Sequence, residues 1–329
     1  MELQLIPQIT DQDNISLDSD QSRNKSKSFI EANTKEVSLS HLSSDCIIPV
    51  FSKDNETTIS HHQFIDAAFE AIKMVFPMEL VSEPEIRISH DIRGRIPEAI
   101  GKPAKELQDY EKTIYYERMA FIYEVKSVTN VINGNELVLS IGGVRAYNQE
   151  NLYSKKAMEK FKVFIGFQNR VCLNMCISTD GYAEEIRASS TDELLTKIVP
   201  LFQGFNVNTM LAKIDGFADY QLTQHQFCQL IGRARLYNYL PKKERLQIPY
   251  LALNDGQISA VTKAYYEDEN FASTGTGNIN LWQLYNLFTG AVKSSYIDNF
   301  LERTVNAYQL TEGLTMALNG HSGYRWFLE

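Results

Sequence analysis

Cysteine, proline and tryptophan are scarce in this chain, and it has no long apolar run. Four cysteines, nine prolines and two tryptophans occur among 329 residues. So few cysteines, behind an acidic N-terminus without the basic and apolar regions of a secretory signal, indicate a reducing compartment. No apolar run approaches the roughly 20 residues that a membrane span requires. We therefore expect a cytoplasmic protein without a membrane partner.

Positive charge is also in deficit. The 32 Lys and Arg residues stand against 41 Asp and Glu, which gives a net charge of −9 and a pI near 5.3. Such a chain has no global basic field that would attract nucleic acid or an anionic membrane. Any nucleic-acid contact must therefore come from a local basic patch.

The sequence signatures of common enzymes are missing as well. There is no nucleophile elbow, metalloprotease His-Glu pair or zinc-deaminase signature, and the glycine-rich loop Ser273–Asn278 lacks the Gly-Lys-Ser/Thr of a P-loop. Cysteines could bind zinc, but Cys172 and Cys176 on one strand would stand about 13 Å apart, too far to share an ion. We expect core cysteines, no metal and no cofactor, and we favour a non-enzymatic protein without catalytic residues.

The most informative stretch runs from Leu137 to Gly181. Its first strand pairs with the alternating run 118–131, because Asn133-Gly134 supplies residues that tolerate the positive φ of a tight hairpin. The strand ends at Gly142-Gly143, a pattern typical of a turn or bulge. This predicts the first half of an antiparallel meander.

A second hairpin follows in the same stretch. Residues 161–167 alternate, Gln168-Asn169 turns the chain, and 171–178 forms the next strand. The meander therefore has at least four antiparallel strands. On this last strand Arg170 and Asn174 would share a face. A buried arginine there requires an anionic partner, which is either an internal carboxylate or a ligand phosphate.

Composition divides the chain into three parts. Residues 1–45 form an acidic and polar tail that we expect to be disordered, 46–188 a β-rich α+β domain, and 189–329 a helical region packed on it. The fold class is thus α+β, with an antiparallel β-meander in the N-terminal half and an all-helical C-terminal half. Within the β-rich domain and before the meander, Asp91–Lys105 is expected as a loop, either solvated or a flexible basic arm beside a ligand groove. Helices are predicted at 61–76, 191–202, 206–220, 223–240, 257–266, 280–291 and 295–318.

Basic and aromatic residues accumulate around the central hairpins. Positive charges that neutralise phosphates and rings that stack bases, at roughly 1–3 kcal/mol per base, are what single-stranded nucleic acid requires. The alternative is that the aromatics belong to the core and the lysines to a solvated face. The candidate nucleic-acid-binding residues are Arg145, Tyr147, Lys155, Lys156, Lys160, Lys162, Arg170, Asn174 and Arg187.

The same residues carry a resemblance. The segments Arg118–Phe121, Gly143–Tyr147 and Arg170–Met175, with Leu281-Trp282, Tyr285-Asn286 and Thr289, resemble a Bacteroidetes domain-of-unknown-function family that is encoded largely on phage and mobile elements. More distantly the chain is similar to the phage/plasmid-like protein family. Where that wider family has a Ser-His-Asp-Gly-like sequence motif, this chain has Gly166–Asn169 instead. The resemblance implies a biological setting and no defined activity.

Three functions remain open from the sequence. The leading hypothesis is a phage or mobile-element protein that binds single-stranded nucleic acid through a basic sheet face, in recombination or DNA maintenance. The second is an anti-defence or anti-restriction accessory that binds a host protein. The third is a nucleotide-using enzyme built on Arg145, Arg170 and the glycine-rich loop. The sequence leaves the partner and the oligomeric state open.

Overall fold

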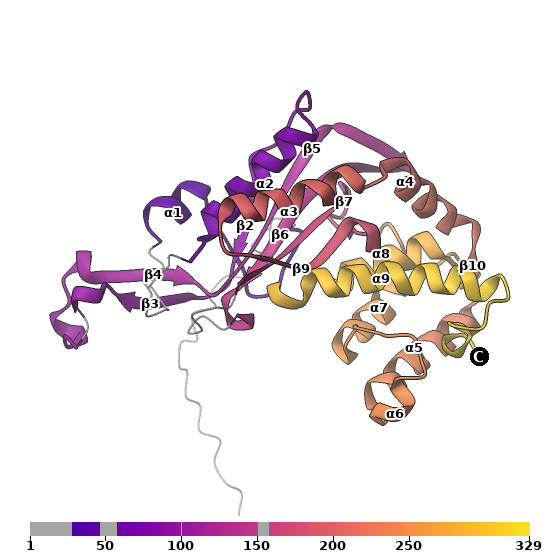
Figure 1. The fold of residues 1–329 in the computed structure, drawn as a ribbon. Coiled ribbons are helices and arrows are strands. Elements are labelled where there is room, and N and C mark those ends of the chain that lie inside the picture. Colours follow the sequence, from indigo (N-terminus) through magenta and orange to yellow (C-terminus); the bar gives the residue numbers. More distant parts are fainter. Residues whose placement is uncertain (1–27, 47–57, 100, 151–157) are drawn as a thin grey trace, which may run out of the picture.

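The computed structural model describes residues 28–46, 58–99, 101–150 and 158–329. Its main element is a curled antiparallel sheet of seven strands (Figure 1). The strand order is β1-β2-β5-β6-β7-β8, and β9 also pairs with β7. This sheet confirms the predicted meander and the α+β class. The strands are β1 (Lys35–Glu36), β2 (Glu85–Ile88), β5 (Arg118–Ile132), β6 (Asn135–Ala146), β7 (Glu159–Asn169), β8 (Met175–Cys176) and β9 (Tyr182–Ala188).

The hairpin between β5 and β6 turns where the sequence predicts it. Asn133 and Gly134 have φ values of 49° and 78° between the paired residues Ile132 and Asn135, the geometry of a two-residue hairpin turn. In contrast, the expected turn or bulge at Gly142-Gly143 is wrong. Strand β6 continues through both glycines and pairs there with β5 and with β7.

The second hairpin differs from its prediction. Strand β8 contains only Met175 and Cys176, because residues 170–173 form a turn in which Leu173 takes a φ of 58°. Cys172 lies in that turn and Cys176 in the core, so the two do not share a strand face. All four cysteines of the chain are free thiols.

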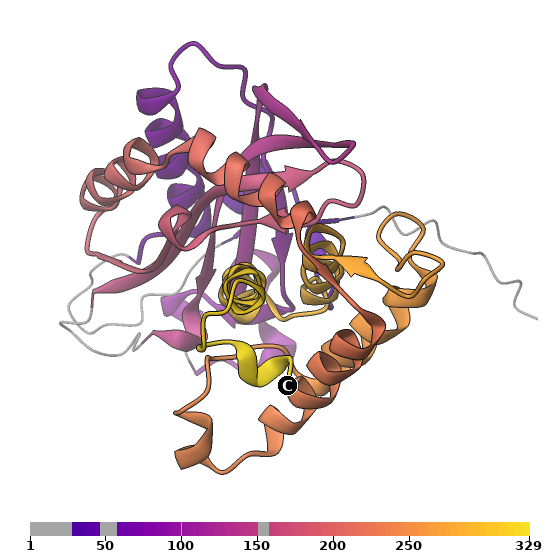
Figure 2. The same ribbon diagram turned by 90° about the vertical axis from the view of Figure 1, so that its right-hand side faces the viewer.

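Different helices cover the two faces of the sheet (Figure 2). Gly143 faces α2 (His61–Val75), since a Cβ at this position would lie 2.5 Å from the Phe64 ring. Lys162 points to the opposite side, where its Nζ donates to Asp298 O of α9 (Ile297–Leu318) at 2.9 Å. Helix α3 packs beside α2, and α8 packs beside α9. We call these sides the α2 face and the α9 face.

The C-terminal part is mostly helical, with one correction to the prediction. Gln221–Leu222 (β10) and Ile279–Asn280 (β11) pair as a small antiparallel sheet, so this half is not all-helical. Its longer helices begin at side-chain caps such as Ser190 and Thr223, whose hydroxyl groups accept from backbone N–H groups. The helices are α3 (Thr191–Gly204), α4 (Val207–Asp215), α5 (Gln224–Tyr239), α6 (Lys242–Arg245), α7 (Asp255–Glu267), α8 (Leu281–Val292) and α9.

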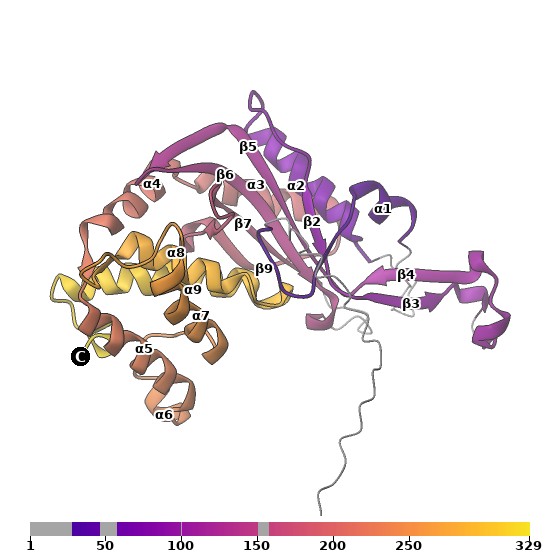
Figure 3. The same cartoon turned by 180° about the vertical axis from the view of Figure 1, so that it is seen from behind.

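A β-hairpin stands out from the body of the molecule (Figures 1 and 3). It consists of β3 (Asp91–Arg95) and β4 (Lys112–Tyr116), joined by short 3-10 turns. The expectation of a loop from Asp91 to Lys105 is therefore wrong for its first residues, which are a paired strand. We call residues 91–116 the arm.

Folded structure begins before residue 46. Phe29 and Ile30 are buried, and β1 and helix α1 (Leu39–Ser44) follow them. Residues 1–27 of the predicted tail lie outside the described residues. Within the described part of the chain, every helix is too short or too polar to cross a membrane.

Candidate functional site

The predicted site residues fall into three separate places. Arg145 and Tyr147 lie in the interior beneath α2, whereas Lys160, Lys162 and Arg187 stand at one end of the α9 face. Arg170 and Asn174 lie around the β7–β8 turn. Lys155 and Lys156 are outside the described residues. The sequence therefore groups residues that the fold separates.

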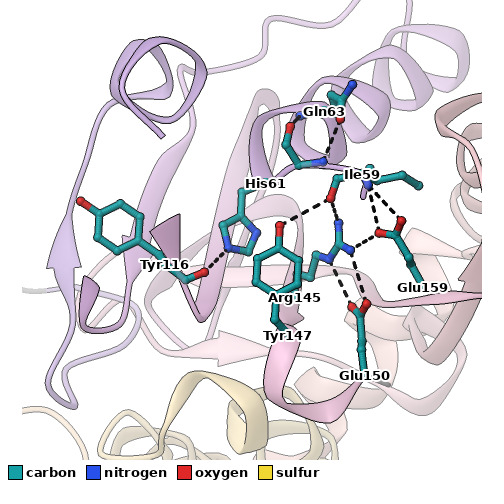
Figure 4. A network of polar contacts seen from close by, with 9 residues as sticks. Ile59, His61, Gln63, Tyr116, Arg145, Tyr147, Glu150 and Glu159 are labelled. Atoms are coloured by element: carbon teal, nitrogen blue, oxygen red, sulfur yellow. Dashed lines mark hydrogen bonds and ion pairs between the residues drawn. The ribbon is translucent and has the colours of Figure 1, made fainter. Parts of the chain in front are cut away.

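Arg145 is the centre of a buried polar network (Figure 4). Its side chain is fully buried and forms ion pairs with Glu150, at 3.2 Å, and with Glu159. It also donates to Ile59 O, while Glu159 accepts from Ile59 N at 3.0 Å. Burial raises the pKa of Glu150, and the guanidinium opposes that shift. The network ties the end of β6 and the start of β7 to the segment before α2, so its role is structural.

Aromatic rings complete this network. The guanidinium of Arg145 lies 4.5 Å from the ring centroids of both Tyr147 and Phe161. His61 stacks on Tyr147 at 4.7 Å, and its Nε2 donates to Tyr116 O at 2.8 Å. Burial, with the nearby charge of Arg145, lowers the pKa of His61 to about 3. His61 is therefore a neutral core residue at physiological pH.

A second group of cations lies at the end of the α9 face where α9 begins. Lys160 of β7 pairs directly with Arg187 of β9, and Lys162 pairs with Val144 of β6. Arg118 starts β5 and contacts α9 through Asp298, 3.5 Å from its Nε. Directly paired residues of neighbouring strands share a face. We call Arg118, Lys160, Lys162 and Arg187 the basic end.

Carboxylates pair with three of the four cations of the basic end, and Lys162 instead donates to the backbone of α9. Glu185 lies 2.8 Å from Lys160 Nζ and 2.5 Å from Arg187 Nε, and these two cations hold its pKa below the usual range. Arg118 pairs with Glu117 at 3.2 Å as well as with Asp298. An anionic ligand would therefore have to displace these carboxylates from the cations.

Two hollows flank the start of α9 at the basic end. One has a volume of about 380 Å³ and is lined by Lys160, Lys162, Glu184 and Glu185, with Val144, Ala146 and Gln149. The other has a volume of about 420 Å³ and includes Arg118 and Tyr296 in its lining. Sequence reasoning did not place Arg118 at the site. The available signal was its parity in the alternating run that begins at Arg118, which is opposite to that of Met119 and Phe121.

Arg170 and Asn174 do not form the predicted pair on a strand face. Arg170 is exposed in the turn and lies near Glu136, at 3.4 Å, and Glu124, at 3.6 Å. Asn174 is buried and donates to Asn286 O at 2.9 Å. The resemblance segments 170–175 and 281–289 therefore meet in the fold, through an amide contact beneath α8.

The glycine-rich loop Ser273–Asn278 closes on itself. Thr274 N donates to Asn278 O at 2.9 Å, and the hydroxyl of Tyr265 donates to Gly277 O. The following helix α8 has its own cap, because the side chain of Asn280 accepts from Gln283 N at 2.8 Å. These contacts are those of a structural loop and an N-cap.

Fold and site together define a class: an α+β protein with a curled antiparallel sheet, helices on both faces, and a cationic end beside a helix start. The chain belongs to the DUF3871 family, a domain of unknown function with a B. theta gene description, which matches residues 10–328. Neither a curated protein nor a solved structure is significantly similar to it.

Proposed function

We propose that this protein is a non-enzymatic binder of single-stranded nucleic acid and that the basic end contacts the strand. The observation that carries the proposal is the convergence of Arg118, Lys160, Lys162 and Arg187 from three strands onto one end of the α9 face. A nucleic-acid strand that lies across β5, β7 and β9 would meet these cations in succession. The proposed setting, which is phage, plasmid or other mobile DNA, rests on the resemblance of segments 118–121 and 170–175 to families encoded on such elements, and a role in recombination or DNA maintenance is part of the proposal.

An aromatic side chain stands beside these cations. Tyr296 is 59% exposed, lines the same hollow as Arg118, and has its ring centroid 6.0 Å from the Arg118 guanidinium. Exposed rings beside cations are the usual platform for a base of single-stranded nucleic acid, because every base can stack whatever its identity. This arrangement supports binding without sequence preference.

The paired carboxylates give the proposed binding two properties. Phosphates must displace Glu185 from Lys160 and Arg187, so binding is weaker than four free cations would give. Each phosphate contact still releases counterions, and the logarithm of affinity falls by roughly 0.7 per contact with the logarithm of salt for single strands. Four contacts predict a slope of roughly −3.

The test is fluorescence anisotropy with labelled oligothymidine at several salt concentrations. We compare the wild type with Lys160→Gln/Arg187→Gln, and with the control Lys213→Gln/Lys263→Gln, which removes two exposed lysines remote from the basic end. The basic-end variant is expected to bind at least tenfold more weakly and to lower the salt slope by roughly 1.4. Equal loss in the control, or no binding by the wild type at low salt, contradicts the proposal.

A second candidate is binding of a basic protein. It is favoured by a groove of about 460 Å³ between the β7–β8 turn and α7–α8, whose lining includes Glu31, Glu267, Asp268 and Glu269. Charge complementarity would suit a cationic host protein. Binding to such a partner that is lost in Glu267→Gln/Glu269→Gln, without any oligothymidine binding by the wild type, would favour this candidate.

A further inference from the structure

The arm is joined to the body at the basic end. Asp91, its first residue, lines the hollow that contains Arg118 and Tyr296, and Tyr116, its last, is two residues before Arg118. A two-stranded hairpin is marginally stable by itself in water. The arm nevertheless extends away from the sheet (Figure 3). Its position suggests that it contacts a ligand held at the basic end.

A groove of about 620 Å³ runs along the arm. Three cations and several apolar groups line it: Arg93, Arg95 and Lys112, with Leu107, Ile114, Ala104, Gly94 and Thr113. Arg93 pairs with Asp91 at 3.1 Å and Lys112 with Asp109 at 2.7 Å, and both cations are largely exposed. The groove thus combines exposed positive charge with an apolar wall.

The groove also holds a buried hydroxyl group without a partner. Thr113 is 5% exposed, and its Oγ1 forms no hydrogen bond within the described residues. The facing residue Gly94 lies directly against it, since a Cβ at Gly94 would lie 2.7 Å from that oxygen, so the hydroxyl is closed off from a ligand in the groove. An unsatisfied buried hydroxyl costs about 1–3 kcal/mol, so Thr113 lowers the stability of the arm, and the charged and apolar side chains of the groove are the groups that a ligand can reach.

Resting on the function proposed above, we propose that the arm binds the continuing part of the same nucleic-acid strand. Arg93, Arg95 and Lys112 contact phosphates, and the wall of Leu107 and Ile114 contacts a base or sugar. A nucleotide unit combines an anion, an apolar ring face and hydrogen-bonding groups. A purely anionic ligand would leave the apolar wall unused.

The geometry predicts a dependence on strand length. Arg95 lies four residues along β3 from Asp91, which is about 13 Å at ~3.3 Å per residue. A short oligonucleotide can therefore occupy the basic end alone, whereas a longer one reaches the arm. The arm contributes to affinity only for the longer strand.

The experiment compares oligothymidines of about 6 and about 20 nucleotides, within the range of single-strand site sizes. The variant Arg93→Gln/Lys112→Gln is expected to bind the long strand about fivefold more weakly, with the salt slope lowered by roughly 1.4, and the short strand unchanged. Lys105→Gln, an exposed arm lysine outside the groove lining, is the matched control and should bind like the wild type.

The outcomes separate this inference from the proposed function. If the basic-end variant loses binding while Arg93→Gln/Lys112→Gln binds the long strand normally, the arm inference fails and the proposed function stands. If the wild type binds neither strand, both fail. If the arm variant changes only the oligomeric state in sedimentation, the groove contacts a second copy of the chain and the inference is overturned.

Discussion

The arginines of this protein show how surroundings decide what one side chain does. Arg145 has no exposed surface and two carboxylates, whereas Arg187 is exposed and shares one carboxylate with Lys160. Both belong to neighbouring parts of the same sheet. The first holds the core together, and the second is free to exchange its partner for a ligand.

Replacing Arg145 should destabilise the fold strongly. In Arg145→Met the apolar bulk remains, but Glu150 and Glu159 lose their shared cation in a buried site, which typically costs about 3–5 kcal/mol. The free energy of unfolding is measured by urea denaturation. Arg187→Met is the control and should change it by less than about 0.5 kcal/mol. Equal stability of the two variants would show that the buried network contributes nothing.

His61 should make stability depend on pH. Its pKa is about 3 in the fold and about 6.5 when unfolded, so between these values only the unfolded chain binds the proton. The contribution is complete above pH 6.5 and decreases by about 1.4 kcal/mol per pH unit as the pH falls toward 3. Denaturation at several pH values measures the slope. In His61→Gln this part of the slope should vanish, and an unchanged slope would contradict the assignment.

Glu185 should act as an intrinsic competitor of the nucleic acid. Glu185→Gln releases Lys160 and Arg187 from their shared carboxylate, so oligothymidine affinity should rise about fivefold at low salt. Glu184→Gln, in the lining of the same hollow, removes an equal charge without releasing those two cations. A similar rise in affinity in both variants would show that the change in net charge, and not the release of Lys160 and Arg187, causes it.

The burial of Arg145 could have been predicted from the sequence. The rule that a buried arginine needs an anionic partner was applied to Arg170, which is exposed. Leu137, Leu139 and Ile141 share their parity with Arg145, and residues of both parities in β6 are buried, so a strand that is apolar on both faces places Arg145 in the core. Its carboxylates could not be identified, because Glu150 and Glu159 come from segments whose course depends on tertiary packing.

At the scale of elements, the middle of β6 depends on its two glycines. A Cβ at Gly142 would lie 2.1 Å from Phe121 O, and one at Gly143 would lie 2.5 Å from the Phe64 ring. Gly142 is thus crowded by the neighbouring strands β5 and β7, and Gly143 by a ring of α2. Glycine in a strand marks such close approach, which is why the expectation of a turn was wrong.

This packing gives a matched pair of alanine substitutions. Gly143→Ala should destabilise the protein by about 2 kcal/mol or more, because the core must move to admit a methyl group. Gly232→Ala in α5 meets open space and should stabilise it by about 0.5–1 kcal/mol through helix propensity. Thermal unfolding measures both. If both variants shift the melting temperature the same way, the packing account is wrong.

Local signals predicted most elements, and their limits have a physical cause. Asn133-Gly134 fixed one hairpin because its turn chemistry is local. Helix α2 was predictable from its cap Ser60 and its apolar stripe. The arm was not, because β3 contains Arg93-Gly94-Arg95 without alternation and finds its partner only at Lys112. Lys160, Lys162 and Arg187 of the basic end could be predicted, because the sequence indicates the register of the meander. Arg118 could not be added to them, because the sequence does not show where α9 packs.

At the scale of the whole molecule, the sheet and the C-terminal helices share one core. Helix α9 contacts β5, β6 and β8, while α3 packs beside α2 on the other face. Neither half can bury its apolar surface without the other. The chain should therefore unfold as one unit, although its halves differ in secondary structure.

Two probes should report the same transition. Trp282 and Trp326 both lie in the helical part, whereas far-ultraviolet circular dichroism reports the whole chain. In urea, the two signals should give coincident midpoints, as a two-state transition requires. Separate midpoints would show that the residues before and after 188 are independent units, and Gly232→Ala should then shift only the tryptophan transition.

The contact between Phe29 and Phe300 has a consequence for biosynthesis. Their rings are 5.9 Å apart, and Glu31 N donates to Lys293 O at 2.9 Å. The first described segment is thus held by residues that the ribosome makes long after it. Until α9 has been made, Phe29 and Ile30 have no complete site, and the growing chain exposes an apolar segment. Cotranslational chaperones could therefore bind this segment before α9 is available to cover it.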